Sequence, residues 1–81
     1  MNQDMLREAF EQAKESNASF VFVGIEAEGI KEIIVVPSTS FEPKQAFYSN
    51  AYNDELVHVM NSKVRIVSLS HGSSDKLNEL I

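Results

Sequence analysis

Two apolar runs on either side of Glu28-Gly29 constrain this chain more than any other part of its sequence. Residues 20–36, FVFVGIEAEGIKEIIVV, predict a β-hairpin because β-branched and aromatic residues flank a two-residue turn. The pairs expected across that turn are Ala27 with Ile30, Glu26 with Lys31, Ile25 with Glu32, Val23 with Ile34 and Val21 with Val36. Opposite charges therefore face each other near the tip.

The predicted hairpin is apolar on both faces over half of its length. One face carries Val21, Val23, Ile25, Ala27, Ile30, Ile34 and Val36. The other carries Phe20, Phe22, Ile33 and Val35, and then gives way to Glu26 and Lys31. A chain of 81 residues has enough helix to cover one sheet face but hardly two. The second face therefore predicts a surface for a partner.

A first amphipathic helix is predicted over residues 2–16, with apolar positions at helical spacing: Met5, Leu6, Ala9, Phe10 and Ala13. Asn2 or Asp4 is expected to cap its start, and Ser16-Asn17 to end it. Pro37 is expected to end the hairpin, because it lacks a backbone donor.

A second helix is predicted to begin near Phe41. Thr39 and Glu42 have the spacing of a capping box, and Pro43 fits a first helical turn. One continuous helix over residues 44–57 is the favoured interpretation, with apolar positions Phe47, Tyr48, Ala51, Tyr52 and Leu56. A break at Asn50, with Asn53 capping a shorter helix, is the alternative.

A third strand is predicted over Val64–Ser70, closed by His71-Gly72. Simple alternation points Val64 and Ile66 to one face and Val67 and Leu69 to the other. Ser73 or Ser74 is then expected to cap a last short helix, DKLNELI, with Leu77, Leu80 and Ile81 as its apolar residues.

These elements predict one α+β domain over residues 1–81. Their order is helix, strand, strand, helix, strand, with a short C-terminal helix. The simplest arrangement is a three-stranded, mainly antiparallel sheet with the two longer helices on one face, because this buries the larger face of the hairpin.

Composition excludes several classes of function. Twelve acids against seven scattered bases give a net charge of −5, which disfavours nucleic-acid binding. There is no cysteine, so disulfides and thiolate chemistry are excluded. The longest apolar runs are four residues, against the roughly 20 that span a bilayer. An acidic start, MNQDMLREAFEQ, differs from a secretory signal, so we expect a cytoplasmic protein.

No arrangement of residues predicts catalysis, a metal or a cofactor. His58 and His71 lack nearby ligands at short spacing, and Ser70 and His71 are adjacent strand residues that point to opposite faces. We therefore predict that the protein is not an enzyme. The carboxylate pairs, such as Glu26 with Glu28, are expected to be solvated surface charges.

Aromatic residues favour an interface instead. Phe41, Phe47, Tyr48 and Tyr52 gather on the second helix and its entry, and only one helical stripe faces the sheet. Core packing is the simpler interpretation of this group. Alternatively, some of it lies exposed beside the second hairpin face. The candidate interface residues are Phe20, Phe22, Ile33, Val35, Tyr48 and Tyr52.

The region KQAFYSNAYNDELVHVMNSKVRIVSLSHG resembles small uncharacterised proteins from phages and prophages of Gram-positive bacteria. The resemblance rests on Ala51-Tyr52-Asn53-Asp54-Glu55-Leu56, a short Asn-containing turn and Val64-Arg65-Ile66-Val67. It implies a bacterial or phage origin and an unbroken second helix, and it implies no catalytic motif.

We expect this chain to act by protein association, as a homodimer that buries the second sheet face. The alternative is a phage-derived inhibitor that binds a host protein or mimics nucleic acid with its acidic surface. Glu8, Glu11 and Glu15 line one flank of the first helix, but Arg7 and Lys14 lie close to them in sequence.

Overall fold

The structure is a computed structural model that describes residues 1–80, with Leu80 described by its backbone alone. Its elements are α1 (Gln3–Glu15), β1 (Phe20–Ala27), β2 (Ile30–Pro37), a 3-10 turn (Ser38–Ser40), α2 (Phe41–Ala51), β3 (Val64–Gly72) and α3 (Ser74–Leu80). The predicted α+β class, the element order and the short C-terminal helix are confirmed. The prediction that Leu80 and Ile81 are apolar residues of the last helix concerns the Leu80 side chain and Ile81, which lie outside the described part of the chain.

The hairpin has the predicted register. Ala27 pairs with Ile30, Glu26 with Lys31, and the pairing continues to Phe20 opposite Pro37. Glu28 and Gly29 both have positive φ values, 52° and 85°. Two positive φ values make the tight turn whose twist matches the flanking strands, and glycine adopts this conformation without strain.

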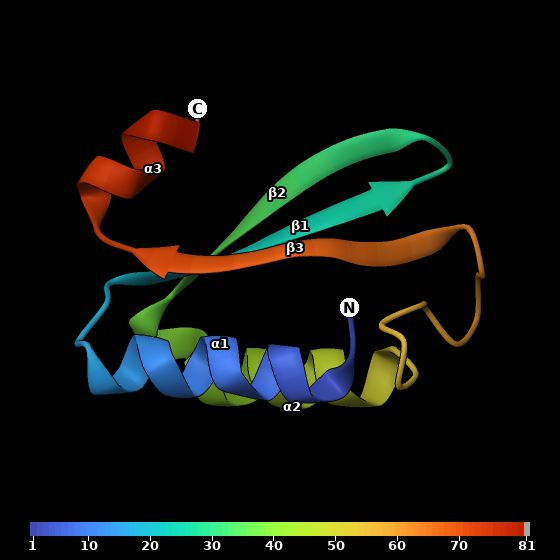
Figure 1. The fold of residues 1–81 in the computed structure, drawn as a ribbon, viewed down its shortest axis with the longest axis horizontal. Helices are drawn as coiled ribbons and strands as arrows, with labels where there is room; N and C mark the ends of the chain where they lie inside the picture. Colours follow the sequence, from blue (N-terminus) through green and yellow to red (C-terminus); the bar gives the residue numbers. More distant parts are fainter. Residues whose placement is uncertain (81) are drawn as a thin grey trace.

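Three antiparallel strands form one sheet in the order β2-β1-β3. Figure 1 shows α1 and α2 side by side beneath one face of this sheet, as predicted, and α3 on the opposite side. The tip of the β1–β2 hairpin rises away from the two long helices. The core lies between the sheet and these helices, and its fully buried members include Leu6, Phe10, Val21, Val23, Val36, Leu56 and Ile66.

Strand β1 is buried on both of its faces. Val21 and Val23 point toward α1 and α2 and have no exposed surface. Phe22 points to the other face, yet only 2% of it is exposed. The end of the sheet that carries Phe22 is the end over which α3 lies (Figure 1). The sheet therefore has a partial second layer, which belongs to the chain itself.

The predicted facing of β3 is wrong at Leu69. Gly24 pairs with Ser68 whereas Ile25 pairs with Ile66, so Val67 is an extra residue without a partner. Such a β-bulge shifts the alternation by one position. Leu69 consequently faces the helices together with Ile66 and packs against the core. The strand also runs two residues further than predicted, through His71 and Gly72.

The second helix is not continuous over residues 44–57, as the favoured interpretation had it; it breaks next to Asn50, as the alternative predicted. It ends at Ala51, and Tyr52 already has an extended conformation with φ −120° and ψ 147°. The Asn53 side chain then accepts hydrogen bonds from the N–H groups of Glu55 (2.9 Å) and Val57 (3.0 Å). Asn53 thus holds a tight turn rather than capping a new helix, because its short side chain competes for the local backbone donors.

Capping predictions were correct for α1 and wrong for α2. Asn2 Oδ1 accepts from the Met5 N–H at 2.9 Å, and Asn17 has a positive φ of 55° after the helix end. At α2 the cap position is Ser40, which makes no side-chain capping bond. The Thr39–Glu42 capping box does not form, since Ser38–Ser40 wind directly into the helix.

No helix within residues 1–80 combines the length and apolar character that crossing a membrane requires.

Replacing Gly24 with alanine tests the tight packing next to the bulge. An added Cβ would lie 3.2 Å from Ser68 Cβ and still closer to Ser68 Oγ. We expect Gly24→Ala to lower the free energy of unfolding by about 1 to 3 kcal/mol, the usual cost of overpacking. Urea unfolding measures this change.

The control is Ser68→Gly in the same background, which removes the clashing side chain. The double variant should regain part of the lost stability relative to the sum of the two single changes. Strictly additive effects would contradict the proposed contact.

Candidate interface at the edge of strand β2

The six residues predicted to form the interface do not share one exposed patch. Phe22, Tyr48 and Tyr52 are buried within the chain, Phe20 and Val35 are half-buried, and Ile33 is 43% exposed. The exposure on which the prediction rested is therefore present only at the Ile33 part of the face. A partner surface has to be sought beside Ile33 rather than over Phe22.

The two tyrosines belong to the core beneath the sheet. Their ring centroids are 5.9 Å apart, and Tyr52 also stacks edge-to-face on His58 at 5.2 Å. Burial raises the pKa of the Tyr48 hydroxyl, with a smaller contribution from Tyr52, and burial likewise raises the pKa of Tyr52. Both side chains are thus neutral packing residues.

Strand β2 has a sheet neighbour on one side only. Its neighbour is β1, so its other side is an edge of the sheet. The Ser38 N–H donates to Ser19 O at 2.9 Å, which continues the β1–β2 ladder and fixes its alternation. Every second residue of β2 therefore bonds to β1, and the N–H groups of Lys31, Ile33 and Val35 point outward.

The opposite edge of the sheet is partly covered by the chain. The His58 N–H donates to Val64 O at 2.8 Å, and the Ile66 N–H donates to Leu56 O at 2.9 Å. The bulge at Val67 follows directly and disturbs the ladder further along. Of the two edges, β2 therefore offers the longer regular row of backbone groups to another strand.

Exposed apolar side chains lie on both sides of the β2 edge. Ile30 is 66% exposed on the helix-facing side, because the hairpin tip rises away from the helices (Figure 1). Ile33 lies on the other side of the strand. Natural edge strands commonly carry charges and proline, and β2 has Lys31, Glu32 and Pro37 near its ends. The middle of the strand is apolar.

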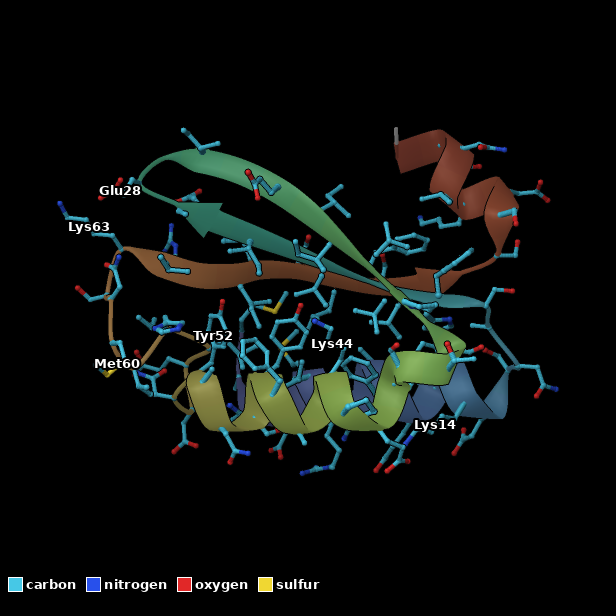
Figure 2. All side chains as sticks on the ribbon, turned by 180° about the vertical axis from the view of Figure 1, so that it is seen from behind. Lys14, Glu28, Lys44, Tyr52, Met60 and Lys63 are labelled. Carbon is cyan, nitrogen blue, oxygen red and sulfur yellow. The ribbon has the colours of Figure 1, made fainter. Side chains whose placement is uncertain are left out.

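Helix α2 adds a third exposed apolar side chain next to this edge. Glu42 Oε1 accepts from Lys14 Nζ at 2.7 Å, so that flank of α2 faces α1. At 100° per residue, Lys44, Phe47 and Ala51 occupy the opposite flank. Phe47 is 53% exposed there, with Lys44 Nζ 5.7 Å from its ring centroid. Figure 2 shows Lys44 on the side of α2 that faces the sheet.

We call these groups together the edge surface. It consists of the outward backbone of Lys31, Ile33 and Val35 and the side chains of Ile30, Ile33 and Phe47. Two of these side chains were not among the predicted interface residues. Ile30 was assigned to the core face of the hairpin, and Phe47 was not included. A helical wheel anchored on Phe41 would have found Phe47, because Tyr48 and Tyr52 share the stripe of Phe41 and Phe47 lies about 100° away.

The histidines have structural surroundings. His58 Nδ1 accepts a hydrogen bond from the Met60 N–H at 3.0 Å, which ties down the turn after α2. His71 pairs with Val21 within the sheet. Over the described range 1–80, no group of three or more His, Cys, Asp or Glu side chains is placed to hold a metal ion.

The acidic flank of α1 is interrupted by bases. Arg7 lies 2.9 Å from Asp4 and 4.0 Å from Glu11, and Lys14 bonds to Glu42. A nucleic-acid mimic presents an unbroken row of negative charge, so this helix supports that hypothesis poorly.

Comparisons with models of known protein families, with curated proteins and with solved structures find no match to this chain. The resemblance to phage and prophage proteins therefore stays a prediction. One of its implications, an unbroken second helix, is wrong, because α2 ends at Ala51.

The Lys14–Glu42 contact predicts a measurable pKa. The Lys14 ammonium, through its hydrogen bond and then its charge, holds the pKa of the Glu42 carboxyl below its ordinary value. Lys14→Met should raise the pKa of Glu42 toward the ordinary value, as followed by NMR titration of side-chain carboxyl carbons. Because the folded pKa is depressed, the contact stabilises the fold at neutral pH, and its contribution is lost as pH falls through that pKa.

The control is Lys14→Arg, which keeps a cation at this position and should leave the pKa of the Glu42 carboxyl depressed. An unchanged Glu42 pKa in the Lys14→Met protein would show that Lys14 does not fix this side of α2 against α1.

Proposed function

We propose that this protein acts by protein association and that the partner contributes a strand to the outer edge of β2. The observation that carries the proposal is the row of outward N–H groups at Lys31, Ile33 and Val35, flanked by exposed Ile30 and Ile33. A strand added there gains backbone hydrogen bonds and covers apolar surface in one step.

The edge supports association better than the sheet face does. Phe22, one of the two phenylalanines of the second face, is already buried, at the end of the sheet over which α3 lies. A partner on that face would gain little from it. The edge surface, in contrast, has backbone groups and side chains that the described part of the chain leaves uncovered.

The inhibitor hypothesis can also use this edge. In that case a host protein donates the added strand. This form of the hypothesis requires no acidic row, and the ion pairs of Arg7 do not count against it. The cytoplasm remains the compartment that we propose for the association, and a phage or prophage remains the proposed origin.

A photocrosslinking side chain placed at position 33 tests the proposal in cells of the source organism. We expect covalent adducts of discrete mass from position 33, either at twice the mass of the chain or at the mass of the chain plus another protein. The same group at Ser49, an exposed residue on the α1 flank of α2, is the matched control.

Adducts at position 33 that are absent at position 49 are the expected result. Absence of adducts at position 33, or equal yields at both positions, would overturn association through the β2 edge.

A further inference from the structure

We infer that the strand added to β2 comes from a second copy of this chain, paired antiparallel about a two-fold axis at Ile33. The inference rests on the proposed function, since it uses the same edge. It names the partner and the register. The product is a continuous six-stranded sheet, with three strands from each copy.

The register follows from which backbone groups are free. When identical strands pair about a two-fold axis, a register centred on Ile33 places Lys31 opposite the partner's Val35 and Ile33 opposite the partner's Ile33. A shift toward the turn places Val35 opposite the partner's Gly29, outside the strand. A shift the other way places Lys31 opposite the partner's Pro37, which has no N–H. Only the Ile33 register pairs both the N–H and the C=O groups of Lys31, Ile33 and Val35 within the two strands.

The same register covers the exposed apolar side chains of β2. Paired residues of an antiparallel ladder have their side chains on the same face, so Ile33 packs on the partner's Ile33. On the helix-facing side, Ile30 lies beside the partner's Val36. The two most exposed isoleucines of β2, at 66% and 43%, are thereby buried.

Phe47 favours a complete second copy over an isolated peptide strand. It lies in the helix layer, on the flank of α2 that faces away from α1. A single added strand leaves that layer uncovered. A second copy adds its own α2 next to the first. Strands are about 4.8 Å apart and packed helices about 8 to 10 Å apart, so one helix fits beneath every two strands. Phe47 and the partner's Phe47 then meet across the two-fold axis.

Unpaired charges at the edge are complementary across the axis. Among residues 1–80, neither Glu32 nor Lys44 makes an ion pair. In the Ile33 register, Glu32 lies next to the partner's Ile34, on the helix-facing side of the sheet. Lys44 lies on the sheet-facing side of α2 (Figure 2), so Glu32 and the partner's Lys44 are on the same side of the joined sheet. Each pair occurs twice by symmetry.

Disulfide trapping tests the register directly, because the chain has no cysteine of its own. Residues opposite each other in a hydrogen-bonded antiparallel pair have Cα atoms about 5.5 Å apart, within the range of a disulfide. Under mild oxidation, purified Ile33→Cys protein should form a covalent dimer. Lys31→Cys and Val35→Cys should each form no covalent dimer alone, and their mixture should cross-link.

Sedimentation of the wild-type chain at about 100 μM supplies the second measurement, with a dimer expected. Phe47→Glu should raise the dimer Kd at least about tenfold, equivalent to 1.4 kcal/mol. Ser49→Glu, with the same charge change on the other flank of α2, should leave the Kd unchanged. Equal effects of the two substitutions would overturn the helix part of the interface.

A dimer in which Ile33→Cys does not cross-link would overturn the register. A strict monomer would overturn the second copy as partner, whereas adducts between position 33 and another protein in cells would still support the proposed function. The failure of this inference is therefore distinguishable from the failure of association at the edge.

Discussion

Burial of β1 on both faces is the constraint on which the rest of this structure depends. Val21 and Val23 on one face and Phe22 on the other are almost completely removed from solvent. Apolar side chains on opposite faces of one strand require cover on both sides of the sheet, at about 25 cal/mol for each Å² removed from water. The layers of α1 and α2 on one side and α3 on the other follow from this requirement.

Covering a short sheet from both sides leaves an edge exposed. The two long helices lie beneath the sheet, α3 covers one end of the other face, and residues 56–58 cap the first part of β3. Little chain remains to cover β2, whose tip rises away from the helices. The exposed Ile30, Ile33 and Phe47 therefore lie where the intramolecular cover ends. The proposed association therefore lies at an edge of the sheet rather than on a face.

Local sequence predicted the structure correctly where a residue favours one conformation at its position. The Glu28-Gly29 turn set the whole hairpin register, and Asn2 and Asn17 marked the ends of α1. The same reasoning failed where two uses compete. Asn53 was expected within or at the start of a helix, but its side chain holds a non-helical turn. Val67 continued an alternating pattern in the sequence, yet the sheet accommodates it as a bulge.

The sequence by itself determined the fold class, the hairpin register and the presence of more apolar strand surface than two helices cover. These properties follow from short-range patterning, which turn geometry and side-chain periodicity fix. Only the tertiary structure decided that α3 lies over one end of the second sheet face, and that β2 rather than β3 keeps a regular uncovered edge. Those outcomes depend on how distant segments share a limited buried surface, and no local pattern encodes that competition.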